Sequence, residues 1–293
     1  MKFSSKIISF LMVICFACLI TAPSAGAATT RFFTLNQVKG QVFVVEKPGA
    51  AKKTAVSGMR VGALAEITTG ANGFARLVTD DGGAVNLAPQ TKLVIKELKQ
   101  NKEGKGKVTV LKNWSGKVFL RTKKLVDKNS RFQIETPTAV AGVRGTIWEV
   151  HYNGKETKVG VFQGAVGLNN KTTLTGLQQA TSVNPQAPVQ VERITANNLN
   201  PWEGEQLSVA VKEVAQEINS QVRSRGKNLS EPELQQLQKE IDELKSLQEM
   251  VDEVYELLGL PAPAPLNFPA DVTEILSSFS GPNSSDNSLG PLF

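Results

Sequence analysis

The chain has 293 residues, with 33 Lys and Arg against 27 Asp and Glu, one His and two Cys. This length can hold one or two domains with buried cores. Because the chain has a single histidine and both cysteines lie near its start, at Cys15 and Cys18, the remainder excludes a Cys/His zinc set, a thiolate nucleophile and a disulfide.

Residues 1–27 have the layout of a secretory signal peptide. Lys2 and Lys6 precede an apolar run from Ile7 to Ile20, and small residues follow up to Ala27. The run is shorter than the roughly 20 residues of a membrane-spanning helix. We therefore expect cleavage, export and no stable membrane span, with an uncleaved anchor as the alternative. Export also separates the protein from nucleic acid, so no nucleic-acid partner is expected.

Residues 32–192 are predicted to form an all-β domain, either a two-sheet sandwich or a coiled sheet. Short runs of alternating apolar and polar residues are separated by turn residues. A Gly-x-Val-x-aliphatic pattern begins at Gly40, Gly116 and Gly164. The intervals are unequal, so this is no fixed-period repeat array. We expect each glycine to form a turn that launches a strand.

The most informative stretch of this domain is residues 131–152. Residues 131–135 alternate like a half-buried strand, and Trp148, Val150 and Tyr152 share one face of a second strand. Between them, Thr136-Pro137 interrupts strand pairing because proline has no N–H. The pattern predicts a β-hairpin with a glycine-rich corner.

The corner contains an arginine in an unusual position. Gly142 and Gly145 bracket Val143-Arg144 and allow a tight turn there. Arginine presents five donors in a planar fork, which suits a clamp on a carboxylate or on several carbonyls. We therefore predict that Arg144 ties the turn to the sheet through Glu135 or Glu149.

The run TPTAVAGVRGTIWEV resembles the signature of the FecR domain, an extracytoplasmic all-β module, and the resemblance extends from about Val38 to Val183. The signature positions are Thr136, Pro137, Gly142, Arg144, Gly145 and Thr146. Ile147 departs from the polar residue more usual in the family, which indicates that this face of the strand is covered. The resemblance also implies extracytoplasmic signal sensing as one function.

Family members that regulate sigma factors resemble single-span proteins, with a cytoplasmic segment, one transmembrane helix and this domain outside. No domain precedes the apolar run in this sequence. The resemblance is therefore not expected to imply sigma-factor regulation here. We expect a protein that is free in the periplasm or secreted.

Lysines crowd the middle of the β domain and form one candidate binding patch: Lys96, Lys99, Lys102, Lys105 and Lys107. One interpretation is a solvated hairpin whose lysines keep strand edges from pairing with other chains. The alternative is a face that binds an anionic envelope polymer, such as peptidoglycan or lipopolysaccharide.

The charge changes sign near residue 200. Residues 28–200 carry 25 Lys and Arg against 11 Asp and Glu, whereas residues 201–293 carry 6 against 16. Asn200-Pro201-Trp202-Glu203 is typical of a helix N-cap followed by proline at the first helical position. Apolar residues at helical spacing then predict an α-helical hairpin over residues 201–258. Its acidic helices are suited to dock on the basic β domain.

The second predicted helix has a wide apolar face, formed by Leu234, Leu237, Ile241, Leu244, Val251 and Leu258. This candidate partner-helix face must be buried against the first helix, the β domain or another protein. Residues 259–265 predict a stiff, extended linker, and residues 259–293 as a whole a proline-rich linker, a short helix and a disordered tail.

No motif for catalysis stands out. His151 is expected at a surface or edge position, and Asp80 and Asp81 lie in a turn where aspartates serve the backbone. We expect no enzymatic activity, no metal and no cofactor. The predicted function is an exported binding or scaffold protein of the bacterial envelope that contacts another envelope protein through the β domain, the helical hairpin or both. Recognition of an anionic polymer and signal sensing are the alternatives.

Overall fold

The structure is a computed structural model that describes residues 31–101, 106–225 and 228–264. The predicted signal peptide, Lys102, Lys105 and the predicted tail from residue 265 onward lie outside the described residues.

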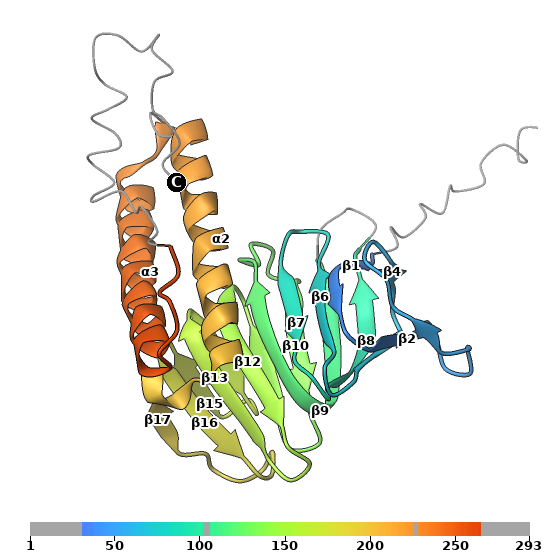
Figure 1. Cartoon of the computed structure of the whole chain (residues 1–293). Helices are drawn as coiled ribbons and strands as arrows, with labels where there is room; N and C mark the ends of the chain where they lie inside the picture. Colours follow the sequence, from blue (N-terminus) through green and yellow to red (C-terminus); the bar gives the residue numbers. More distant parts are fainter. Residues whose placement is uncertain (1–30, 102–105, 226–227, 265–293) are drawn as a thin grey trace, which may run out of the picture.

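The described chain is mostly β-sheet, followed by two helices that form a hairpin (Figure 1). The strands are β1 (Phe33–Lys39), β2 (Val42–Val45), β3 (Lys53–Thr54), β4 (Arg60–Val61), β5 (Glu66–Thr69), β6 (Phe74–Val78), β7 (Ala84–Leu87), β8 (Lys92–Lys99), β9 (Val108–Thr122), β10 (Arg131–Glu135), β11 (Val140–Val143), β12 (Thr146–Tyr152), β13 (Thr157–Gln163), β14 (Ala165–Leu168), β15 (Thr172–Thr175), β16 (Gln178–Ser182) and β17 (Val191–Arg193). The helical elements are the 3-10 helix η1 (Ala196–Asn198), α2 (Pro201–Arg225) and α3 (Glu231–Leu257). The predicted fold class is confirmed.

The strands form two stacked sheets that share β9. Sheet A has the order β4-β1-β6-β7-β9-β12-β13-β16-β17. Sheet B has the order β3-β2-β5-β8-β9-β10-β11-β14-β15. All these pairs are antiparallel except β10 with β9. The two sheets enclose one core as a sandwich does, and they are continuous through β9 as in a coiled sheet, so the structure combines the two predicted architectures.

A bend at Gly116 carries β9 from sheet B into sheet A. Residues 108–115 pair with β8, and residues 116–122 pair with β12. Gly116 has a φ of +81°, and a Cβ there would lie 2.5 Å from Oγ1 of Thr91, so a side chain is excluded. The predicted glycine turns are confirmed at Gly40, before β2, and at Gly164, before β14. At Gly116 the glycine instead forms a bend within one strand.

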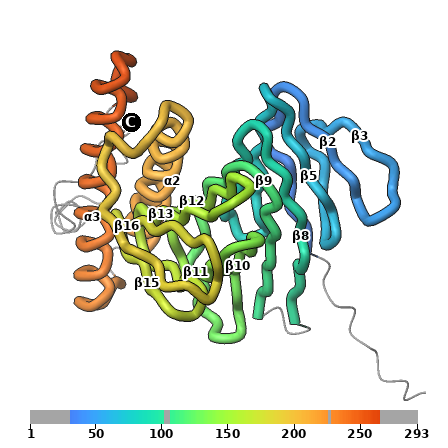
Figure 2. Tube along the Cα trace, turned by 90° about the horizontal axis from the view of Figure 1, so that it is seen from below, coloured from blue at the N-terminus to red at the C-terminus, as the bar shows by residue number. Residues whose placement is uncertain are grey.

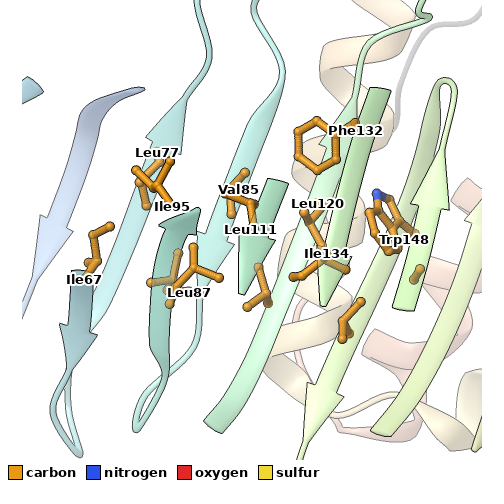
Figure 3. Packing of buried hydrophobic residues seen from close by; sticks show 14 of the residues in the cluster. Ile67, Leu77, Val85, Leu87, Ile95, Leu111, Leu120, Phe132, Ile134 and Trp148 are labelled. Atoms are coloured by element: carbon orange, nitrogen blue, oxygen red, sulfur yellow. The ribbon is translucent and has the colours of Figure 1, made fainter. Parts of the chain in front are cut away.

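The main core lies between the two sheets (Figure 3). Trp148 is fully buried and meets Phe132 edge-on, with ring centroids 6.4 Å apart. Its indole Nε1 donates to Oγ1 of Thr122 at 3.1 Å, so the polar atom of this large side chain is satisfied. The alternation correctly predicted the buried positions Phe132, Ile134, Trp148 and Val150, whereas Tyr152 at the end of β12 is only half-buried.

The helical hairpin lies against the outer face of sheet A (Figures 1 and 2). A second apolar core joins the two. Ile147 on β12 is 2% exposed and packs within this core. The inference that this face of the strand is covered is therefore correct. The sheet residues Phe119, Ile147 and Phe162 pack in one cluster with Leu207, Val211 and Ile218 of α2 and with Ile241, Leu244 and Val251 of α3.

The hairpin predicted for residues 131–152 is wrong. Residues 140–143 form a strand of their own, β11, which pairs with β10 in sheet B. The run 146–152 is β12, which lies in sheet A between β9 and β13. Gly145, with a φ of +122°, carries the chain between the sheets. Alternation shows that a strand has a buried face, but it does not identify the pairing partner.

Candidate functional site

The first signature positions build a tight turn between β10 and β11. Oγ1 of Thr136 accepts a hydrogen bond from the backbone N–H of Ala139 at 2.9 Å. The hydroxyls of Thr136 and Thr138 each lie within 2.7 Å of the Thr157 hydroxyl on β13. These threonines join the two sheets at one corner of the sandwich, which is a structural task.

The next signature positions are also explained by local geometry. A Cβ on Gly145 would lie 2.8 Å from Cα of Lys124, so the close approach of two backbones requires glycine. Thr146 is 4% exposed, and its Oγ1 donates to the carbonyl of Ala165 at 3.1 Å. The corner therefore holds β11, β12 and β14 in register.

The predicted carboxylate clamp of Arg144 is wrong. Arg144 is exposed, and its Nη2 donates to the backbone carbonyl of Lys128 at 3.1 Å. Glu135 instead pairs with Lys96 at 2.7 Å. Glu149 points out of sheet A, under the helices, whereas Arg144 follows a strand of sheet B. The crossing between sheets separates the groups that a simple hairpin would have brought together.

The lysine patch is largely neutralised where the structure describes it. Lys96 pairs with Glu135 at 2.7 Å, and Lys99 lies 3.3 Å from Glu97. Lys107 lies 3.3 Å from the Asp80 carboxylate. These three lysines therefore offer a weaker field for a polyanion than their number in the sequence indicates.

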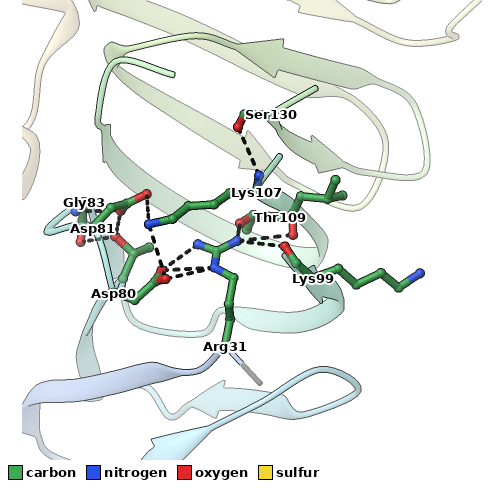
Figure 4. A network of polar contacts seen from close by, with 10 residues as sticks. Arg31, Asp80, Asp81, Gly83, Lys99, Lys107, Thr109 and Ser130 are labelled. Carbon is green, nitrogen blue, oxygen red and sulfur yellow. Dashed lines mark hydrogen bonds and ion pairs between the residues drawn. The ribbon is translucent and has the colours of Figure 1, made fainter. Parts of the chain in front are cut away.

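Figure 4 shows how Lys107 joins a network built around Arg31, close to the predicted cleavage point. The Arg31 side chain is 2% exposed, and its Nη2 lies 2.6 Å from Oδ1 of Asp80. Burial acts to raise the pKa of Asp80, but the hydrogen bonds and charge of Arg31 outweigh it and hold that pKa below its usual value. Asp81 does serve the backbone, because its Oδ1 accepts from the N–H of Gly83.

An acidic face of α2 lies on basic residues of sheet A. Arg121 on β9 lies 2.7 Å from Glu217 and 2.9 Å from Glu213. Arg76 on β6 lies 2.5 Å from Glu213, and Lys123 also pairs with Glu217. The expected electrostatic docking of the helices on the β domain is thus present.

The N-terminus of α2 is fixed by its own cap and by the sheet. The backbone N–H of Asn200 donates to Glu203 at 2.7 Å, and Oδ1 of Asn200 accepts from the N–H of Glu203 at 3.0 Å. Glu203 also forms an ion pair with Lys117 of β9. The predicted cap is confirmed, and one carboxylate serves both the helix start and the interface.

The candidate partner-helix face is occupied within the chain. Leu237, Ile241, Leu244 and Val251 are at most 6% exposed, and Leu234 packs beside them in the same core. Of the predicted set only Leu258, at 38%, is exposed. Of the three coverings that the sequence left open, the first helix and the β domain are the ones observed, so these buried residues are not free to dock another protein.

Beneath the hairpin lies a polar cluster that the sequence did not reveal. Glu149 is 3% exposed, and its Oε2 has no hydrogen-bond partner among the described residues. Burial raises the pKa of Glu149, although Lys117 and Lys158 oppose the shift. Burial also lowers the pKa of His151, and the same two lysines add to that effect.

His151 lies on β12, which has a partner on each side, so the predicted edge position is wrong. Its side chain is half-buried, so it is only partly at the surface. The signal that could have placed it is Ile147, an apolar residue on the same strand face as Glu149 and His151.

Two features are absent from the parts of the chain that the structure describes. No group of three or more His, Cys, Asp or Glu residues there is placed to hold a metal ion. No described helix combines the length and apolarity needed to cross a membrane.

The outer face of sheet B, in contrast to that of sheet A, is not packed against the hairpin (Figure 2). Its outward positions on β10, β11, β14 and β15 are half-buried or exposed, among them Gln133, Gly142, Gly167 and Thr173. This face is the candidate interaction surface of the molecule.

The described residues form a β-sandwich with a docked helical hairpin, and comparison with known families identifies the sandwich. The family model described as FecR protein matches residues 65–167, so the chain carries a FecR domain in its β region. FecR-domain proteins are typically extracytoplasmic.

Two crystal structures of a provisionally assigned anti-sigma factor from Parabacteroides distasonis ATCC 8503 also align with the chain, at 18% identity and a TM-score of 0.35. Each alignment covers 44% of this chain and 59% of that chain. No curated protein matches in sequence.

Proposed function

We propose that this chain is an exported, non-catalytic binding protein of the bacterial envelope that contacts another envelope protein through the outer face of sheet B. The observation that carries the proposal is the position of the hairpin. The hairpin covers the outer face of sheet A and buries its own apolar face there. Among the described residues, the outer face of sheet B is a broad surface that the hairpin does not cover, and we assign the partner to it.

The start of the β domain supports export with cleavage. Arg31, four residues after Ala27, is already anchored to Asp80 and Thr109. Fractionation of cells that express the full chain, followed by N-terminal sequencing, tests this part. A cytoplasmic protein that retains Met1 would contradict it.

The interaction itself is tested with a photo-crosslinking residue placed on each face. One copy carries it at Thr173, which is exposed on sheet B, and the control copy carries it at Lys212, which is exposed on α2. We expect a discrete crosslinked envelope protein from position 173 and none from position 212. Crosslinks from position 212 alone would move the interface to the hairpin.

Recognition of an anionic polymer by the lysine patch is the weaker candidate, because Lys96, Lys99 and Lys107 already pair with carboxylates. Signal sensing remains compatible with the proposal, since a sensor in the envelope also requires a partner-binding face.

A further inference from the structure

Resting on this proposed function, we propose that the partner presents an acidic, extended polypeptide segment to a glycine strip on sheet B. The glycine strip consists of Gly142 on β11 and Gly167 on β14, which are directly paired across the two strands. In the complex, carboxylates of the segment pair with Arg131 and Arg144 beside the strip.

The glycine strip faces outward and is free of side chains. On β11, Ala141 and Val143 point into the core, so Gly142 between them faces outward. On β14, Val166 and Leu168 point into the core, so Gly167 between them also faces outward. Their pairing therefore places two missing side chains next to each other on the outer face. Another polypeptide backbone can approach the sheet more closely at these two glycines than at positions that carry a side chain.

None of the residues that the structure describes requires glycine at these two positions. Neither residue has a positive φ. A Cβ on Gly142 would meet no atom nearer than 3.9 Å, and one on Gly167 none nearer than 3.8 Å, which is ordinary contact. Gly145 and Gly164 differ, since both have positive φ and would clash with the backbone. Because glycine weakens a strand, two adjacent glycines without an internal cause indicate close approach of an external backbone.

Two arginines follow the strip in the strand register. Phe132 pairs with Val143, so one step along this register Arg131 lies opposite Arg144. Both arginines are exposed, and neither forms an ion pair with a carboxylate among the described residues, although Nη2 of Arg144 donates to the backbone carbonyl of Lys128. Like charges placed across a strand pair are unfavourable, and an anionic partner would relieve this repulsion. Arginine also suits carboxylates because it can bind them with two parallel hydrogen bonds.

The remaining neighbours favour a polypeptide over a sugar polymer. Gln133 and Thr173 continue the row of the strip on either side, and Val140 and Ala165 border it. These residues offer amide and hydroxyl groups to a peptide backbone and small apolar groups to its side chains. None of them supplies the flat aromatic face on which sugar rings commonly stack.

The test uses the mature full chain and fluorescent synthetic peptides. The probe alternates glutamate with threonine, and the matched control replaces every glutamate with glutamine. Fluorescence anisotropy should show binding of the acidic probe alone, and this binding should weaken between about 50 and 300 mM salt, where screening of exposed charges increases. An anionic glycan fragment serves as the competing class of ligand.

Three variants locate the site. Gly167→Thr has room in the fold, so it should leave thermal unfolding unchanged while reducing probe affinity by about tenfold or more, because the side chain blocks backbone approach. Arg131→Gln and Arg144→Gln should each reduce affinity by about threefold, as expected for exposed charge pairs. Arg193→Gln, an exposed arginine on β17 in sheet A, is the matched control and should bind like wild type.

The outcomes separate this inference from the proposed function. Probe affinity that is unchanged in Gly167→Thr and in both arginine variants would overturn the inference. Competition by the glycan with a higher affinity than the peptide probe would overturn it as well. If position 173 still crosslinked to an envelope protein, the proposed function would stand with a different mode of recognition. If neither the probe nor the crosslink appeared, both would fail.

Discussion

The guanidinium of Arg121 on β9 reaches the carboxylate of Glu217 on α2, with Nη1 2.7 Å from Oε1. Arg121 also donates to the backbone carbonyl of Gly82 at 2.7 Å, so a single side chain ties the helix to the sheet and to the β6–β7 turn. Its side chain is 8% exposed, whereas the carboxylates of Glu213 and Glu217 are 29% and 35% exposed. The interface thus places a buried cation against partly hydrated anions.

Replacement of Arg121 by alanine should loosen the hairpin. The change leaves Glu213 and Glu217 one helical turn apart with less positive charge to balance them. We expect a loss of about 1–2 kcal/mol in the free energy of unfolding, less than for a fully buried pair because both carboxylates reach solvent. Urea unfolding measures it, with the exposed Arg193→Ala as control. An unchanged midpoint would mean that apolar packing alone holds α2.

The two signature glycines should respond differently to alanine. Gly145→Ala forces a Cβ to within 2.8 Å of the Lys124 backbone at a φ of +122°, so a loss of about 1–3 kcal/mol is expected. Gly142→Ala meets no such contact and should be neutral or slightly stabilising, because alanine restricts the unfolded chain. Thermal denaturation of the pair makes the comparison. Equal losses would show that position 142 is also constrained from within.

Replacement of leucines on the α3 face should reduce stability in proportion to how deeply each leucine is buried. Leu244 is 0% exposed, and Leu244→Ala is expected to cost about 2–5 kcal/mol because it leaves a cavity between the helices and the sheet. Leu258→Ala, at 38% exposure, should change stability by less than about 0.5 kcal/mol. Chemical denaturation of both variants is the measurement. A mild effect at Leu244 would argue that the hairpin is not docked in solution.

Glu149 should make stability depend on pH. Burial raises its pKa above the ordinary 4.5, so the folded protein holds this proton more tightly than the unfolded chain does. That stabilisation is complete below the unfolded pKa and is lost as the pH rises through the higher folded pKa. The glutamine of the Glu149→Gln variant does not titrate. The melting temperature of this variant should therefore rise relative to that of the wild type as the pH increases from about 5 to 8.

His151 acts in the opposite direction, because its lowered pKa gives stability that is lost as the pH falls. It is present in both proteins, so its contribution largely cancels in the comparison of Glu149→Gln with wild type. A melting-temperature difference that stayed constant across the range would show that Glu149 keeps an ordinary pKa.

Features set by neighbouring residues were predictable from the sequence. The capping of α2 by Asn200 and Glu203, the break before Ser230 and the inward face of Trp148 all follow from spacings of a few residues. The covered face at Ile147 was also predictable, because an apolar residue at an outward position requires a covering element.

Features that depend on distant pairing were not predictable. The separate strand β11 and the crossing at Gly145 place Arg144 and Glu149 on opposite sides of the sandwich, although they are close in sequence. The paired glycines 142 and 167 become neighbours only through the register of β11 with β14. Local patterns carry no information on which distant strand supplies the partner.

The sharing of β9 sets the limits of any usable fragment. Its first half is bonded between β8 and β10, and its second half between β7 and β12, so each sheet is interrupted without it. The family match begins at residue 65 and ends at residue 167, yet β1 pairs with β6 and β13 with β16 across those limits. Excision at the family boundaries would therefore strip both sheets of outer strands. Residues 31–193 keep every strand with its partners, but the outer face of sheet A is buried only by α2 and α3. Residues 31–257 are therefore the smallest unit that keeps both cores, and we expect them to melt in a single cooperative transition.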